Sequence, residues 1–268
     1  MPVFSERKDL NVNNVDGFQT VNMFWHGAEL GPVHSACIRS FLRQGHPVIL
    51  HCYNAPIDVP DGVQLFDASK LMPLSDLIAN SETGSVSLGA DRYRYRLIEA
   101  GFGLYVDCDM FCLKPIPESE YIFGEEDSQR INNAVLKFPP DSELSQALIA
   151  ATENEYFIPE WLNAKRKFLL RARRSIGFPK SVRGMRWGVW GPNLLTHQIN
   201  KIGLGHEAKP IDYFYPIHYF STSLLFEPGL TIKDLATPRT LAIHLCHKTL
   251  GSLQAPPDSP LGEIVNQI

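Results

Sequence analysis

The chain has 268 residues, which suffices for one large α/β domain or two small ones with a sizeable hydrophobic core. Its 44% hydrophobic content and the lack of low-complexity segments exclude a disordered chain. No apolar stretch approaches the roughly 20 residues that span a bilayer, and the N-terminus lacks the basic-then-apolar pattern of a signal peptide, so we expect a cytoplasmic protein.

The formal net charge of −4 is distributed unevenly along the chain. Residues 165–186 contain nine of the 25 lysines and arginines and no acid, so the remainder carries 16 basic against 29 acidic residues, a net −13. This asymmetry predicts an anionic partner, with a solvated helix face as the alternative. Because the run lacks the regular aromatic interleaving of a nucleic-acid platform, we expect no nucleic-acid partner.

The five cysteines are odd in number and irregular in spacing, which favours reduced thiols over a disulfide framework. Cys108 and Cys112 have a spacing that suits half of a zinc site. No second pair lies at a usable distance along the chain, so we predict that both are small buried side chains.

The N-terminal quarter alternates strands and helix. We expect strands at 21–27, 47–53 and 63–66, with a helix at 32–45 that ends at a glycine. Crossovers long enough for helices predict a mostly parallel sheet covered by helices on both faces. Ligands in such sheets bind beyond the carboxyl ends of the strands.

The segment 91–115 combines a helix, a glycine-containing turn and a strand that leads into two aspartates. We expect the helix to run up to Ala100, and the apolar residues 104–106 to form a short buried strand. If that strand continues, Asp107 and Asp109 share one face, roughly 7 Å apart. Two such carboxylates can bind one Mg²⁺ or Mn²⁺ ion and leave room for phosphates. A lone D-x-D is more often a solvated turn.

The remaining chain predicts further regular elements. The basic stretch is expected to begin as a helix and to end in a loop containing glycine and proline. The other expected elements are strands at 121–124 and 133–136, helices at 141–154 and 193–202, a packing segment at 213–218 and a strand at 241–248.

Asp91 and Arg94 share one helical face three residues apart, and taken alone they suggest a surface ion pair worth roughly 0–1 kcal/mol. In context they resemble the motif of glycosyltransferases with an A-type fold. The pattern looks most like the bacterial capsule and lipopolysaccharide sugar transferases (family thirty-two) related to the catalytic domain of the clostridial glucosylating toxins. Phe102 departs from the pattern, which has a glycine there. The matching positions are Asp91, Arg94, Gly103, Tyr105, Asp107, Asp109, Lys114 and Pro115.

The resemblance runs from Asn22 to about Ser252. It implies a Rossmann-like, mostly parallel sheet with helices on both faces and a smaller mixed sheet region. It also implies a single catalytic domain over 1–268 with its core at about 20–252. The basic segment, taken as 160–186, would be an insertion facing an anionic acceptor, such as a lipid-linked saccharide phosphate, or anionic headgroups at the inner face of the membrane.

The resemblance further implies the reaction and its residues. A Mn²⁺- or Mg²⁺-dependent enzyme would move a sugar from a nucleotide-sugar donor to a saccharide or lipid-linked acceptor, with retention, in surface polysaccharide synthesis. The metal would be held by Asp107, Asp109 and a late histidine, with His244 as first choice and His247 as second. The donor would be held by Asp91 and Arg94 at the sugar hydroxyls, Asn133 (beside Asn132) near the transferred sugar, Trp25 at the base, and Gly191 at a helix start.

Two other classes stay open. A metal-dependent phosphohydrolase would need further acids or histidines near Asp109, and the sequence offers no D-x-D-x-T or H-D pair. A non-catalytic module that binds a saccharide or protein on a degenerate transferase fold is favoured by Phe102 and by Gly251–Leu253 standing in place of the family's Ser-Trp turn. The intact D-x-x-R and D-x-D argue against that module.

Overall fold

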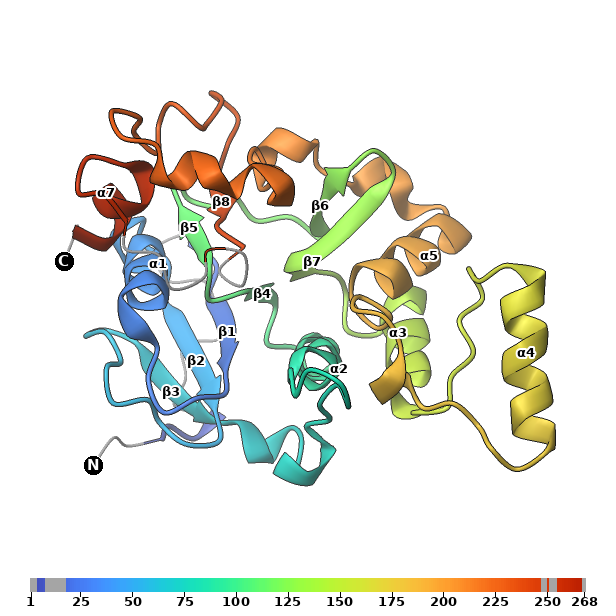
Figure 1. Cartoon of the computed structure of the whole chain (residues 1–268). Helices are drawn as coiled ribbons and strands as arrows, with labels where there is room; N and C mark the ends of the chain where they lie inside the picture. The colour runs from blue at the N-terminus through green and yellow to red at the C-terminus, as the bar shows by residue number, and fades with distance from the viewer. Residues whose placement is uncertain (1–3, 8–17, 247–249, 251–254, 267–268) are drawn as a thin grey trace.

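The computed structural model describes residues 4–7, 18–246, 250 and 255–266. Its main sheet contains β1 (Val21–Trp25), β2 (Val48–Cys52), β3 (Gln64–Asp67), β4 (Leu104–Val106), β6 (Ile122–Asp127) and β7 (Arg130–Lys137). The strand order is β3-β2-β1-β4-β7-β6 (Figure 1). The first four strands are parallel, and β7 adds antiparallel to β4 and to β6. The expected mostly parallel sheet with a smaller mixed part is therefore confirmed.

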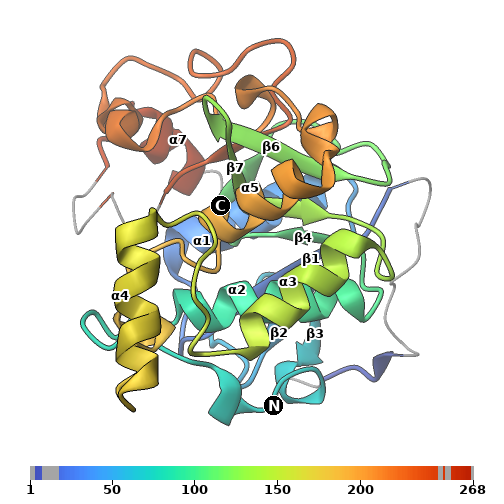
Figure 2. The same ribbon diagram turned by 90° about the vertical axis from the view of Figure 1, so that its right-hand side faces the viewer.

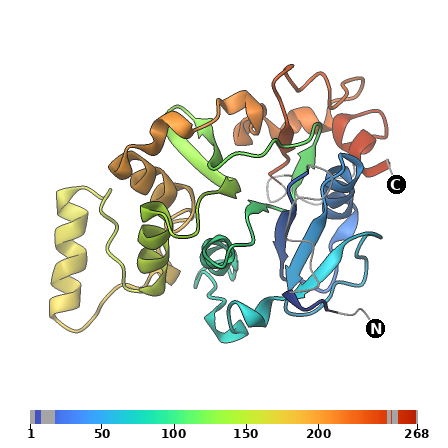
Figure 3. The same cartoon turned by 180° about the vertical axis from the view of Figure 1, so that it is seen from behind.

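Helices cover both faces of this sheet, as expected. α1 (Gly31–Arg43) lies on one face, and α2 (Ser87–Glu99), α3 (Glu143–Glu153) and α5 (Pro192–Ile202) lie on the other. α4 (Ala164–Ser175) and α7 (Pro260–Asn266) lie outside these two layers (Figure 1). Side chains along β1 alternate between the faces. Val21 and Met23 pack in one core with Phe41 of α1, while Phe24 stacks on Tyr93 of α2 at 4.3 Å on the other side. Figure 3 shows the same layers from behind.

Most elements match their sequence-based bounds within a few residues, but α2 begins at Ser87 rather than at Asp91. The small, polar run before Asp91 favours a loop by composition. In the structure Gly89 packs so closely on the preceding segment that a Cβ there would lie 2.5 Å from Leu77 Cδ1. Tertiary packing therefore extends the helix by one turn.

The turn between α2 and β4 explains why Phe102 stands where the family pattern has a glycine. Gly101 and Gly103 both adopt positive φ angles, of 76° and 88°, which a glycine accommodates without strain. The residue between them is buried, and its ring packs edge-on against Phe66 at 5.0 Å. The turn is thus built by two glycines on either side of an aromatic core residue.

A separate two-stranded sheet joins distant parts of the chain. β5 (Met110–Cys112) pairs antiparallel with β8 (Ala242–His244), and Met110 lies opposite His244. This pairing carries a histidine from near the end of the chain to the two aspartates that precede β5.

The cysteine prediction agrees with the structure. All five cysteines are free, and all except Cys246 are buried. Among the described residues, Cys108 and Cys112 belong to no group of three potential metal ligands. Within that same part of the chain, none of the helices is both long enough and apolar enough to cross a bilayer.

Candidate active site

Polar side chains gather at the carboxyl edge of the parallel strands. β4 ends at Val106, Asp107 follows it directly, and β1 lies beside β4 in parallel register. This edge is where ligands bind in sheets of this type.

The two aspartates lie in a turn and not on a strand, so the expected alternation along a strand is wrong. The backbone N–H of Met110 donates to the carbonyl of Asp107 at 3.1 Å, which closes a four-residue turn between β4 and β5. The Cys108 thiol is buried and donates to the carbonyl of Phe24 at 3.5 Å, which ties the turn to β1. Asp107 and Asp109 converge because the turn reverses the chain.

Asp107, Asp109 and His244 form one cluster. One ligand atom from each lies within 4.8 Å of the others, and His244 Nε2 is 3.3 Å from Asp109 Oδ1. Their side chains keep 25%, 18% and 16% of their surface exposed, so the cluster is reachable from solvent. The structure thus brings together the three residues expected to hold a metal; the second choice, His247, lies outside the described residues.

The chemistry of this cluster fits a divalent cation. Two carboxylates supply the hard oxygen ligands that Mg²⁺ and Mn²⁺ prefer, and three protein ligands leave positions for water or phosphate. Burial alone would lower the pKa of His244, but the Asp109 carboxylate outweighs burial and raises the pKa well above its ordinary value. This shift favours the protonated imidazole, and a metal ion has to displace that proton to bind His244.

Arg94 lies behind the cluster and links it to Asp91. Its guanidinium is 3.1 Å from Asp107 Oδ1 and 3.6 Å from Asp91 Oδ1, and it also donates to the Asn133 carbonyl at 2.5 Å. Burial by itself would lower the pKa of Arg94, but Asp107 outweighs burial and raises it. Arg94 and Asp91 are both buried, so they form part of an internal network and not a surface ion pair.

Asn133, and not its neighbour, completes this network. Asn133 Nδ2 donates to Asp91 Oδ1 at 2.8 Å. Asn132 turns away, and its amide donates to Glu126 at 2.8 Å. The two asparagines lie on opposite faces of β7, because neighbouring side chains on a strand alternate.

Gly191 approaches the same acid from α5. It is the N-cap residue of that helix, and a Cβ in its place would lie 2.9 Å from Asp91 Oδ2. A carboxylate at a helix N-terminus is stabilised by the helix dipole. Glycine at this position therefore permits the close approach of the helix to Asp91.

Trp25 lies at the carboxyl end of β1, as expected, but outside this network. Its indole N–H donates to the Glu29 carbonyl at 3.0 Å, and its ring packs against His34 at 4.4 Å. Residues 251–253, which stand in place of the family's Ser-Trp turn, lie outside the described residues.

Two tyrosines support the site in ways that sequence reasoning did not assign. Tyr105 donates its hydroxyl to Asp107 Oδ1 at 2.8 Å, and Arg94 lies over its ring. Tyr95 donates to the carbonyl of Trp190 at 2.7 Å and so fixes the residue before Gly191. The spacing along the sequence could have indicated a role for Tyr95, because it follows Asp91 by one helical turn and lies on the same helical face.

The comparisons with known proteins give a limited result. No family model matches the chain, and no curated protein matches it. Among the solved structures that resemble the chain are two glycosyltransferases at low identity. "PaToxG Glycosyltransferase" shares 11% identity at a TM-score of 0.43, covering 70% of each chain. The "WbbM bifunctional glycosytransferase apo structure" shares 12% at a TM-score of 0.41, covering 96% of this chain and 50% of that one, so this chain spans half of its length.

Proposed function

We propose that this chain is a metal-dependent glycosyltransferase that moves a sugar from a nucleotide sugar to a saccharide or lipid-linked acceptor, with retention. One observation carries the proposal: Asp107, Asp109 and His244 converge at the carboxyl edge of a parallel sheet, and Arg94 connects them to Asp91. A buried acid and a solvent-accessible ligand cluster in one network suit a substrate with both hydroxyl and phosphate groups.

Asp107, Asp109 and His244 are the proposed ligands of Mn²⁺ or Mg²⁺. When bound, such an ion would offset the negative charge that develops on the leaving diphosphate. Asp107 is held in place for this role by Arg94 and by the hydroxyl of Tyr105. Ligands held this way need little reorganisation when the substrate arrives.

Asp91 and Asn133 are the proposed sugar-binding pair, with Arg94 between them and the metal ligands. Asn133 donates to one carboxylate oxygen of Asp91, which fixes the orientation of the other. Binding sugar hydroxyls there would hold the anomeric carbon in one position, which is catalysis by orientation. We further propose Trp25 for the nucleotide base and the Gly191 backbone, at the N-terminus of α5, for an approach to the donor.

The acceptor, the cellular role and the location belong to the same proposal. We propose an anionic or lipid-linked saccharide acceptor, surface polysaccharide synthesis, and a cytoplasmic enzyme near the inner face of the membrane. The support is the uneven charge of the chain, with nine basic residues and no acid at 165–186.

Asp109→Asn tests the site. It removes one metal-binding charge while keeping the shape of the side chain, and we expect transfer to fall at least about a hundredfold, comparable to the loss of one transition-state stabilising group. The measurement is the rate of sugar transfer with Mn²⁺ present. The matched control is Asp61→Asn, which changes an exposed aspartate in the loop after β2 and should leave the rate unchanged.

An Asp109→Asn protein with full metal-dependent activity would show that the assignment is wrong. Release of phosphate from the donor without transfer by the parent protein would favour the phosphohydrolase class. Donor binding without any turnover would favour the binding module.

A further inference from the structure

α4 differs from the other helices of the structure in how it packs. None of its twelve residues, all of which the structure describes, is buried, whereas α1, α2, α3 and α5 each bury five or more. It is the outermost helix and lies beyond α3 and α5 (Figures 1 and 2). The apolar side chains of α4 are therefore not buried in a hydrophobic core.

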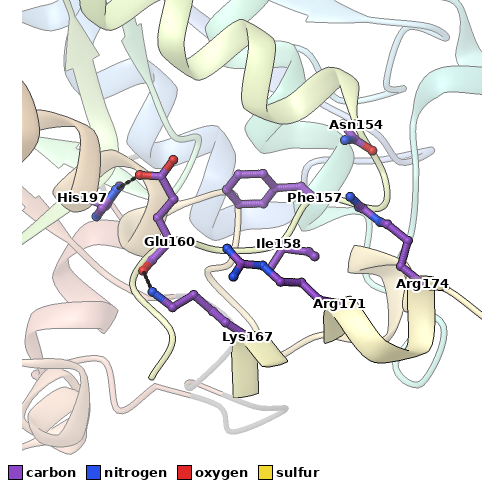
Figure 4. A pocket seen from close by; sticks show the side chains of 8 residues that line it. All are labelled: Asn154, Phe157, Ile158, Glu160, Lys167, Arg171, Arg174 and His197. Atoms are coloured by element: carbon purple, nitrogen blue, oxygen red, sulfur yellow. Dashed lines mark hydrogen bonds and ion pairs between the residues drawn. The ribbon is translucent and has the colours of Figure 1, made fainter. Parts of the chain in front are cut away.

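One face of α4 is polar and is attached to the body of the protein. Lys167, Arg171 and Arg174, spaced four and three residues apart, line a cavity of about 670 Å³ together with His197 of α5 (Figure 4). Lys167 donates to the Glu160 carbonyl at 3.2 Å, and Arg174 donates to the Tyr156 carbonyl. These contacts fix which side of the helix faces outward.

The outward face is apolar. Phe168, Leu169 and Ile176 keep 69%, 51% and 69% of their surface exposed. Together with Ala172 they recur at spacings of three and four residues, which places them on one side of the helix. Phe178, just after the helix, is also 69% exposed. We call these five residues, Phe168, Leu169, Ala172, Ile176 and Phe178, the outer strip.

Positive charge lies beside the outer strip, on one flank and at the start of the helix. Lys165, Arg166 and Arg173 come from turns of the same helix and do not line the cavity. The segment 165–186 contains no acid that would neutralise them. Helices that lie in a membrane interface combine an apolar face with flanking lysines and arginines in this way.

We propose that α4 is a membrane-surface helix that binds anionic lipid bilayers. The outer strip enters the boundary between headgroups and acyl chains, and the flanking cations contact lipid phosphates. This assignment refines the anionic partner proposed above, but it does not depend on the transferase activity.

The shape of the exposed surface favours a bilayer over other anionic partners. α4 offers only one face, because the opposite face is attached through Lys167 and Arg174, so a protein that wraps around a basic helix could not enclose it. A planar bilayer needs only one face. Nucleic-acid platforms combine cations with successive stacking rings, whereas the outer strip has only two rings, Phe168 and Phe178, among aliphatic side chains that cannot stack.

Vesicle sedimentation tests the proposal. The parent protein should bind vesicles in which phosphatidylglycerol replaces part of the phosphatidylcholine, and should bind pure phosphatidylcholine vesicles far more weakly. The double variant Phe168→Gln, Leu169→Gln keeps good helix-forming residues but should bind at least tenfold more weakly. Arg166→Gln should weaken binding about fivefold, since one cation near such a surface contributes about 1 kcal/mol.

The matched control is Phe220→Gln, Leu224→Gln, which removes an exposed apolar pair elsewhere on the surface and should bind like the parent. Circular dichroism should show the same helix content in all variants. As a second measurement, the fluorescence of the tryptophan introduced by Phe168→Trp should be quenched by vesicles with brominated acyl chains.

Three results would overturn the proposal. The first is a folded parent protein that does not bind anionic vesicles. The second is a Phe168→Gln, Leu169→Gln variant that binds as well as the parent. The third is a Lys167→Gln, Arg171→Gln variant that no longer binds vesicles while the Phe168→Gln, Leu169→Gln variant still does. That result would place the anion contact in the cavity.

Discussion

The site at the edge of the sheet and the helix α4 both concentrate charged residues, but they use charge in opposite ways. Asp91 and Arg94 are buried and joined by ion pairs and hydrogen bonds to the cluster around Asp107. Arg166 and Arg173 are exposed, beside apolar side chains that are exposed too. Charges of the first kind hold each other in position, and charges of the second kind are available to a partner.

Among changes at the site, loss of Arg94 should have the largest effect on stability. Arg94→Met leaves the buried carboxylate of Asp91 and the partly exposed carboxylate of Asp107 without their cation. Breaking a buried ion pair by removing one partner typically costs about 3–5 kcal/mol. We expect the free energy of unfolding to fall by that amount in urea titration. Arg166→Met on α4 is the matched control, and it should change stability by less than about 0.5 kcal/mol. Equal losses of stability in the two variants would show that the charged residues of the two regions do not differ in what they contribute to the fold.

Gly191→Ala should disturb the site with less effect on the fold. The added methyl group would lie 2.9 Å from an Asp91 oxygen, so this carboxylate has to move. Displacement of a positioned group by about 1 Å can reduce a rate about a hundredfold, and we expect a loss of ten- to a hundredfold in transfer. Gly205→Ala, where a Cβ has no contact closer than 3.8 Å, is the control. An unchanged rate in Gly191→Ala would show that the Asp91 position does not matter.

The burial of His51 predicts that the free energy of unfolding depends on pH. An exposed histidine would not give this dependence. Burial lowers its pKa to about 3, compared with about 6.5 in an unfolded chain. Between these values the unfolded state binds one more proton, so stability is lost as the pH falls below about 6.5. At about pH 5.5 this loss amounts to about 1.4 kcal/mol.

The variant His51→Gln isolates this contribution, since an amide can still bond to Asn22 and Tyr93. Its free energy of unfolding should lose about 1.4 kcal/mol less than that of the parent between about pH 7.5 and 5.5. The same loss in both proteins would mean that His51 is not held neutral by burial.

The smallest expected effect concerns Phe168 on the outer strip. Phe168→Ala should change the free energy of unfolding by less than about 0.5 kcal/mol, because the ring has no core contacts to lose. Phe102→Ala should cost about 3–5 kcal/mol, because that ring is buried between two glycines of positive φ. A large loss for Phe168→Ala would mean that α4 supports the fold.

Local patterns predicted most of the fold. Short apolar runs bounded by glycine and proline gave the strands, and the basic run 165–186 gave the start of α4. The beginning of α2 was missed because its cause is not local: Gly89 extends the helix by packing on Leu77. The turn geometry of Asp107 and Asp109 was also missed, because the same residues are compatible with a strand.

Local sequence patterns predicted the site less well than they predicted the fold. The partner of Asp109 comes from β8, and only the pairing of β5 with β8 brings His244 beside it. The resemblance to a family pointed to that histidine, whereas spacing alone did not. The roles of Tyr95 and Tyr105 depend on where their hydroxyls point, which a sequence does not specify.

The most direct measurement of the central claim is thermal stabilisation of the purified protein by nucleotide sugars, with and without Mn²⁺. We predict that one donor stabilises the parent protein only when Mn²⁺ is present, by about 2.7 kcal/mol at a donor concentration one hundred times its dissociation constant. Asp109→Asn should lose this response. If a folded parent protein responds to no donor with Mn²⁺ present, the cluster of Asp107, Asp109 and His244 is not a nucleotide-sugar site.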